Sequence, residues 1–309
     1  MRVLVTGGAG FIGSNLCRRL LTTPSVDHVV ALDDLSSGFA DNLAGVDVEL
    51  VEGSMLDDAV LARASDGVDA IAHLGARPSV ARSVADPVAS HLANATGTVS
   101  VLEAARREGA YVVAASSSSV YGANPTLPKR EDMATRPMSP YAASKLATEA
   151  YTNAYHHSYG LTTLALRFFN VFGPRQAAGH AYAAVVPAFV DAALRGESLV
   201  VHGDGRQTRD FTYVDTVTAV IADAIVRRHA EPDPLNLAFG SRVDLLTLIE
   251  LLEAELGHPV ERRHVETRVG DVPHSQADGS RLRAAFPTVE ATSLADGLAA
   301  TIAWMRSTI

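Results

Sequence analysis

The sequence contains little cysteine and little lysine. Cys17 is the only cysteine, which excludes a disulfide framework and a cysteine-based metal site, and we expect no metal ion. A lone cysteine also fits a reducing compartment, so we expect the protein to be cytoplasmic. Of the 26 basic residues only Lys129 and Lys145 are lysines, and all others are arginines. The lysine at position 145 therefore needs a specific explanation.

Long apolar runs and an excess of positive charge are also missing. No stretch reaches the ~18 apolar residues that a membrane helix needs, and the first residues, MRVLVTGGAG, do not have the pattern of a signal peptide. The formal net charge of −9 argues against nucleic acid and against an anionic membrane surface as partners. It is compatible with a small anionic ligand, because a local arginine cluster can bind one.

Short apolar runs alternate with helical patterns in the first half of the chain. The runs with the composition of buried strands are 2–6, 28–32, 46–51, 68–74, 110–116 and 162–168. The helical patterns between them lie near 11–22, 57–64, 86–108 and 141–159. This alternation predicts an α/β fold with a Rossmann-like, doubly wound parallel sheet. After about residue 170 this alternation becomes less regular, which predicts a first domain over 1–170 and a smaller substrate-binding lobe over 171–309. The pattern also allows strand exchange between the two.

The segment TGGAGFIG, residues 6–13, follows the first predicted strand and opens the first predicted helix. Gly7, Gly10 and Gly13 allow a tight turn and let the backbone approach a pyrophosphate, which the amino-terminal N–H groups of the helix would bind. Asp33 ends the second strand, where a carboxylate accepts hydrogen bonds from the adenosine ribose and repels a 2′-phosphate. The pattern therefore predicts NAD rather than NADP. A glycine-rich turn without a ligand is the simpler alternative.

Tyr141 and Lys145 form the second pattern with chemical meaning. They follow Ser139 and Pro140, which are typical of a helix start, and their spacing puts them on one face of that helix. The lysine charge would lower the pKa of the phenol from ~10 toward neutrality, which would make the tyrosinate a usable general base. The run SSSSVYG, residues 116–122, ends the fifth strand at the edge where parallel sheets bind ligands, although some of these serines would only cap the strand.

Together, TGGAGFIG, Asp33, SSSSVYG and the Tyr141/Lys145 pair resemble the extended short-chain dehydrogenase/reductase family, and within it the nucleotide-sugar 4-epimerases. The resemblance covers residues 1–305. It implies an NAD-binding domain, a lobe for a UDP-sugar, and a homodimer formed by helices near 90–108 and 141–158. It implies Ser117, Tyr141 and Lys145 as the catalytic residues. The cofactor residues that it implies are Gly7, Gly10, Phe11, Ile12, Gly13, Asp33, Leu74, Tyr141 and Lys145.

Three segments of the second half, RFFNVFGPRQ, DGRQTRDFTYV and RVGDVPHSQAD, resemble the same family. By that resemblance, Asn170, Arg209 and Arg268 bind the diphosphate, Asp271 binds the uridine ribose, and His202 stacks on uracil. Planar guanidinium groups pair bidentately with phosphate oxygens, so two arginines suit a pyrophosphate. Without the surrounding motif, each arginine would be interpreted as a solvated surface charge.

The residues after Ser117 distinguish reactions that share one opening step. In this family the tyrosinate removes the C4 hydroxyl proton of the sugar while a hydride passes to NAD, which gives a 4-ketose. Dehydratases then use an Asp-Glu pair, and decarboxylases a glutamate, where this chain has Ser118 and Ser119; neither serine is a general acid at neutral pH. The sequence therefore predicts a 4-epimerase, an isomerase that regenerates its NAD. A reductase or dehydrogenase of the same fold and a non-catalytic NAD-sensing regulator are the alternatives.

The identity of the sugar depends on the residues that would surround it. The resemblance places Ser275 where UDP-glucose/UDP-galactose enzymes often have a tyrosine, so a larger sugar would fit; an ordinary loop serine is the alternative. Further substrate contacts are expected from Arg77, Ser118, Ser119 and His180. The arginine favours UDP-glucuronate/UDP-galacturonate, because a carboxylate needs a cation nearby. UDP-N-acetylglucosamine/UDP-N-acetylgalactosamine and UDP-glucose/UDP-galactose are the alternatives.

Overall fold

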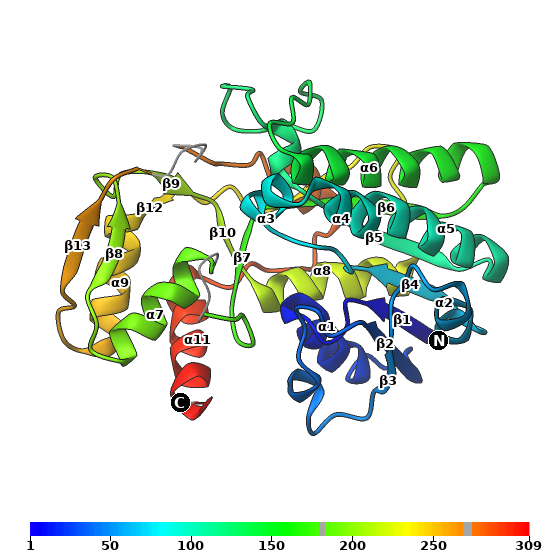
Figure 1. Cartoon of the computed structure of the whole chain (residues 1–309), viewed down its shortest axis with the longest axis horizontal. Coiled ribbons are helices and arrows are strands. Elements are labelled where there is room, and N and C mark those ends of the chain that lie inside the picture. Colours follow the sequence, from blue (N-terminus) through cyan, green and yellow to red (C-terminus); the bar gives the residue numbers. More distant parts are fainter. Residues whose placement is uncertain (179–182, 268–273, 309) are drawn as a thin grey trace. The chain divides into compact units, whose positions relative to one another are not determined.

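The computed structural model describes residues 1–178, 183–267 and 274–308 (Figure 1). By its contacts the chain divides into two compact units, each assembled from separate segments. Unit 1 consists of residues 1–125, 131–168 and 218–237. Unit 2 consists of residues 126–130 and 169–217 and of the remainder from residue 238. The predicted domain boundary after residue 170 stays a prediction, since the segments that make up the units alternate along the chain.

A seven-stranded parallel sheet forms the centre of unit 1, and the predicted α/β class with a doubly wound parallel sheet is confirmed. Its order is β11-β6-β5-β4-β1-β2-β3. The strands are β1 (Arg2–Thr6), β2 (His28–Asp33), β3 (Glu49–Glu52), β4 (Ala70–His73), β5 (Tyr111–Ser117), β6 (Thr163–Phe168) and β11 (Leu235–Leu237). Strands β1, β4 and β5 are almost entirely buried, as expected for a parallel sheet that helices cover on both faces.

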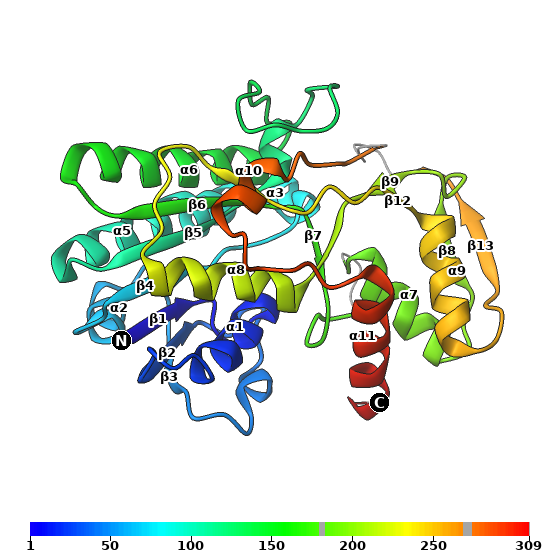
Figure 2. The ribbon, with the colours of Figure 1, turned by 180° about the vertical axis from the view of Figure 1, so that it is seen from behind.

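Helices cover the two faces of this sheet (Figure 2). One apolar core joins the sheet to α2 (Asp58–Ser65), α5 (Gly97–Glu108) and α6 (Pro140–Tyr159). On the other face lie α1 (Phe11–Leu21) and the unit 1 part of α8 (Val214–Arg227), joined by a hydrogen bond of 3.0 Å from Arg19 Nε to Thr218 Oγ1. The shorter elements of unit 1 are η1 (Ala40–Leu43), α3 (Val80–Ala85), α4 (Pro87–His91), the π-helical η2 (Leu92–Thr96) and η3 (Ser118–Tyr121).

Unit 2 has a second apolar core between short strand pairs and three helices. The strand pairs are β7 (Asn170–Phe172) with β10 (Phe211–Tyr213), β8 (Leu199–His202) with β13 (Arg262–Val265), and β9 (Thr208–Arg209) with β12 (Val243–Asp244). The helices of this core are α7 (Val185–Leu194), α9 (Leu245–Leu256) and α11 (Leu294–Thr308), and α10 (Ser280–Ala285) is a shorter one. Within the described ranges, no helix combines the length and the hydropathy that crossing a bilayer would require.

Candidate active site

The turn between β1 and α1 lets another group come close to its backbone. Gly7 has a φ of +69°, and its N–H donates to the carbonyl oxygen of Leu32 at 2.8 Å. A Cβ atom added at Gly13 would lie 2.0 Å from the carbonyl oxygen of Gly7, so only glycine lets α1 start this close to the turn. Gly10 is the N-cap of α1, and no described side chain caps the helix there. The amino-terminal N–H groups, with the positive end of the helix dipole, can therefore bind an anionic ligand. This geometry fits the pyrophosphate of NAD.

The other predicted cofactor residues surround this turn. Phe11 and Ile12 are the first residues of α1, and Leu74 follows β4 and donates its N–H to the Thr6 carbonyl oxygen at 3.2 Å. Their contacts with a cofactor stay a prediction.

Asp33 is a buried carboxylate at the carboxyl end of β2. Its two oxygens accept hydrogen bonds from the N–H groups of Ala9 and Leu35, both at 2.9 Å. Burial raises the pKa of this carboxyl group, and the two backbone hydrogen bonds lower it. The group is therefore fixed beside the glycine turn and has acceptor capacity left for ribose hydroxyls. These features fit NAD.

Tyr141 and Ser117 meet where β5 ends. Ser117 is the last residue of β5 and caps η3, and its hydroxyl is close enough to the Tyr141 phenol to affect the pKa of that group. Burial raises the pKa of the Tyr141 phenol, and the interaction with Ser117 offsets part of that rise. The prediction that the charge of Lys145 lowers the pKa of the Tyr141 phenol was wrong for the chain without a bound ligand. The physical reason is that the site removes the phenolate from water, which disfavours its charge.

Lys145 lies one turn after Tyr141 on α6 and is only 5% exposed. Its Nζ donates to the carbonyl oxygen of Ala115 at 2.8 Å, and burial lowers its pKa to about 8. The side chain can therefore gain or lose a proton near neutral pH. Arginine stays protonated in proteins, so it could not replace lysine here.

A chain of buried polar side chains connects the glycine turn to α6, and the sequence did not reveal it. Thr6 Oγ1 accepts a hydrogen bond from the Gly75 N–H at 3.1 Å and contacts His73 Nδ1 at 2.8 Å. The other ring nitrogen of His73 lies 3.0 Å from Thr98 Oγ1, which lies 3.1 Å from Thr148 Oγ1 on α6. Burial lowers the pKa of His73 to about 3, so its ring is neutral and has one donor and one acceptor nitrogen.

Asn94 extends this chain to the loop after β4. It lies in the π-helical turn η2, a distortion that often marks functional sites. Its Oδ1 accepts from the Arg77 N–H at 2.7 Å, and its Nδ2 donates to Ser144 Oγ at 2.9 Å. The Arg77 guanidinium in turn pairs with the Asp86 carboxylate at 2.9 Å. Sequence periodicity predicted one continuous helix over 86–108 and therefore missed this turn.

Two of the remaining predicted substrate residues, Ser118 and Ser119, begin η3 directly after Ser117. The hydroxyl of Ser117 lies 3.1 Å from that of Ser119 and accepts from its N–H at 3.2 Å. The two serines therefore lie beside the Ser117–Tyr141 pair. Their contacts with a substrate stay a prediction.

Unit 2 brings together some of its own predicted residues. Arg209 Nη1 donates to the Thr208 carbonyl oxygen at 3.0 Å, and the Ser275 N–H donates to the same oxygen at 3.0 Å. Asn170 donates its N–H to the carbonyl oxygen of Asp210, the residue after Arg209, at 3.1 Å. Asn170, Arg209 and Ser275 therefore lie within one backbone network.

The remaining predicted residues of unit 2 are His202 and three residues outside the described ranges. His202 ends β8 and contacts the Glu266 carbonyl oxygen through Nδ1 at 2.9 Å. His180, Arg268 and Asp271 lie outside the described residues. The substrate roles of these residues stay predictions.

Asp210 is a buried acid that sequence reasoning passed over. Its carboxylate accepts hydrogen bonds from the Ala277 N–H and the Ser241 hydroxyl, both at 2.9 Å. Burial raises its pKa to about 6. Through these bonds it holds the segment after Ser275 beside β10.

Residues 3–238 match the NAD dependent epimerase/dehydratase family. The chain belongs to this family. It is 39% identical over 317 residues to a UDP-glucose 4-epimerase of Mycolicibacterium smegmatis, covering 99% of each chain. Its fold matches the UDP-N-acetylglucosamine 4-epimerase of Methanobrevibacter ruminantium, solved with UDP-N-acetylmuramic acid, with a TM-score of 0.93, 35% identity and coverage of 100% and 99%.

A third relative carries out a different reaction. The dTDP-glucose 4,6-dehydratase of Streptomyces venezuelae, solved with NAD and TYD bound, matches with a TM-score of 0.90 and 35% identity, covering 99% of this chain and 97% of that one. The predicted family, the enzymatic nature of the protein and NAD as its cofactor are confirmed. Within the described ranges, no group of acidic, histidine or cysteine side chains could hold a metal ion.

Proposed function

We propose that the protein is a UDP-sugar 4-epimerase that inverts C4 through a transient 4-keto sugar. The observation that carries the proposal is the bond of 2.8 Å from Lys145 Nζ to the Ala115 carbonyl oxygen. It places Lys145 and Tyr141, one turn before it on α6, at the end of β5 that carries Ser117. A phenol, a hydroxyl and a titratable ammonium at the carboxyl edge of a parallel sheet form a proton-transfer site.

The residues of this site would act as follows. Bound NAD supplies an acceptor, and then a donor, for the C4 hydride. Tyr141, as phenolate, takes the proton from the C4 hydroxyl as that hydride leaves, and gives it back when the hydride returns to the opposite face of C4. Ser117 orients the phenol and the C4 oxygen. Burial raises the pKa of Tyr141 in the chain by itself, and the ammonium of Lys145 would favour the phenolate once substrate and cofactor occupy the site.

The neighbours of Ser117 favour epimerisation over the loss of water. A 4,6-dehydratase needs an acid and a base beside the 4-keto sugar, and the two positions that follow Ser117 are serines. A serine hydroxyl does not ionise near neutral pH, so Ser118 and Ser119 cannot supply that pair. Without further chemistry, the ketose can only be reduced again at C4.

On the sugar, we propose a ring without a negative charge, such as that of UDP-glucose or UDP-N-acetylglucosamine. UDP-glucuronate is favoured only by the positive charge of Arg77. Its guanidinium pairs with Asp86 at 2.9 Å, and this partner competes with a substrate carboxylate. UDP-glucuronate therefore stays a prediction, to be compared directly with the two uncharged sugars.

Replacing Tyr141 tests the reaction. Tyr141→Phe removes only the hydroxyl, so kcat should fall at least ~10²-fold while the KM for the UDP-sugar changes little. Tyr159→Phe, at an exposed position at the end of the same helix, is the matched control and should keep wild-type kinetics. Initial rates of epimer formation, resolved by chromatography, give both constants. Turnover near that of the wild type in Tyr141→Phe would refute the assignment of the base.

Replacing Ser275 tests the size of the sugar pocket. Ser275→Tyr should lower kcat/KM for UDP-N-acetylglucosamine about 10-fold or more relative to UDP-glucose, because the added ring fills the volume that the acetamido group needs. Ser280→Tyr, at an exposed position of α10, is the control. The rates of the wild type and both variants are compared on UDP-glucose, UDP-N-acetylglucosamine and UDP-glucuronate. Equal losses on all three sugars would show that Ser275 does not line the pocket.

We also propose that the protein is a homodimer. Val84, Val88, Leu92 and Tyr151 are 44–67% exposed and belong to α3, α4, η2 and α6, which pack against one another. An apolar surface that spans adjoining helices favours a protein partner. Sedimentation velocity should give twice the mass of the chain. Val88→Glu should weaken the dimer, while Val226→Glu, at an exposed position of α8, should not. A monomeric wild type at micromolar concentration would contradict this proposal.

A further inference from the structure

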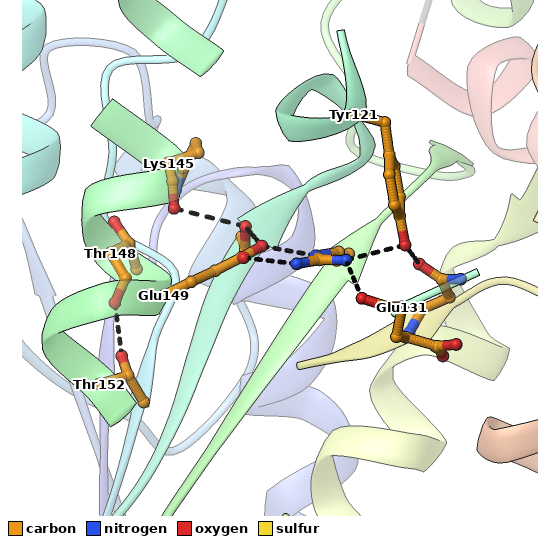
Figure 3. A network of polar contacts seen from close by, with 9 residues as sticks. Tyr121, Glu131, Lys145, Thr148, Glu149 and Thr152 are labelled. Carbon is orange, nitrogen blue, oxygen red and sulfur yellow. Dashed lines mark hydrogen bonds and ion pairs between the residues drawn. The ribbon is translucent and has the colours of Figure 1, made fainter. Parts of the chain in front are cut away.

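A buried ion pair joins β6 to α6 within a network of polar contacts (Figure 3). Arg167 of β6 donates from Nε and Nη2 to the two carboxylate oxygens of Glu149 on α6, each at 2.8 Å. The side chains of Arg167 and Glu149 are only 5% and 4% exposed. This bidentate pair fixes β6 to α6 in both distance and orientation. No catalytic role described so far uses it.

One end of the pair reaches the strand that carries Ser117. Ser116 donates from its hydroxyl to Glu149 Oε1, and Glu149 lies one turn after Lys145 on α6. Along β5, the carbonyl oxygen of Ala115 accepts a hydrogen bond from Lys145, and the Ser116 hydroxyl donates one to Glu149. The next hydroxyl, that of Ser117, interacts with the Tyr141 phenol. Three consecutive residues of β5 thus each interact with a side chain of α6.

The other end of the pair reaches the segment after Ser117. Arg167 Nη1 donates to the Tyr121 hydroxyl at 2.9 Å, and that hydroxyl donates to Asn236 Oδ1 of β11 at 2.6 Å. The Asn236 N–H donates to Glu131 Oε1 at 2.9 Å (Figure 3). Tyr121 ends η3, which begins at Ser118, so the network holds the chain on both sides of Ser117.

We propose that Glu149 and Arg167 are positioning residues for the proton transfer at C4. The pair holds Ser116 and Tyr121, and through them it sets the place of the Ser117 hydroxyl relative to Tyr141 and Lys145. The inference rests on the proposed function, because it assumes that Ser117 and Tyr141 act in C4 chemistry. If the pair only stabilised the fold, removing it would lower the free energy of unfolding and leave the turnover of the folded enzyme unchanged.

The test compares Glu149→Gln with Glu103→Gln. Glu103 of α5 also pairs with an arginine and accepts a hydrogen bond from the Tyr155 hydroxyl of α6 at 2.7 Å. Tyr155 lies near the carboxyl end of α6, far along the helix from Tyr141. Glu149→Gln keeps the shape of the side chain and should lower kcat, per bound NAD, ~10-fold or more with an unchanged KM, because displaced reacting groups cost turnover. Glu103→Gln should keep the wild-type kcat.

A double-mutant cycle separates positioning from stability. If Glu149 acts through Ser117, then Glu149→Gln should lower kcat less than ~2-fold further in a Ser117→Ala background. Losses that multiply would show that the pair does not act through Ser117. Ser116→Ala keeps the ion pair intact and serves as a second variant where Glu149→Gln does not fold. It should lower kcat a few-fold, about 3-fold or more, at unchanged KM, since only the link to β5 is lost.

Two outcomes overturn the inference, and a third overturns the proposed function instead. Wild-type kcat per bound NAD in Glu149→Gln overturns the inference; where that variant does not fold, wild-type kcat in Ser116→Ala does so. Multiplicative losses in the cycle also overturn it. An inactive wild type on every UDP-sugar tested overturns the proposed function.

Discussion

The buried ion pair between Glu149 and Arg167 constrains the carboxyl end of the sheet in unit 1, because it fixes β6 to α6 and contacts residues on both sides of Ser117. Two charges inside a protein are tolerated only when each satisfies the other and the remaining polar atoms are bonded. Here the pair meets that condition by also engaging Ser116 and Tyr121. Removing one partner of such a pair costs about 3–5 kcal/mol, because the other charge remains buried without compensation. The arrangement therefore admits little local rearrangement around Ser117.

Burial controls the electrostatics of the whole site. It raises the pKa of Tyr141, lowers that of Lys145 to about 8, and lowers that of His73 to about 3. Each shift favours the uncharged form, as expected where side chains lose their contact with water. A proton-transfer site of this kind needs charge only transiently, and a low-dielectric surrounding makes each nearby charge more effective when substrate and cofactor are present.

The sequence predicted the features that depend on local pattern. Strands β1, β2, β5 and β6, the glycine turn and the start of α6 at Pro140 follow from apolar runs, glycine spacing and a serine N-cap. The sequence could not predict features that depend on contacts between distant segments. Examples are the π-helical turn at Asn94 and the identity of the later residues, 235–237, that join the first sheet as β11. The pKa of Tyr141 also belongs to this group, because its direction depends on how far the fold removes the phenol from water.

In the proposed epimerisation, C4 is inverted by a hydride that leaves and returns within one enzyme. The direct measurement uses a UDP-sugar deuterated at C4, incubated with the purified protein without added nucleotide. The account predicts that the C4 epimer forms and retains its deuterium, with no free NADH released, since the same bound cofactor returns the label. Epimer that has exchanged the label for solvent hydrogen, or product formation only when nucleotide is supplied, would contradict the account.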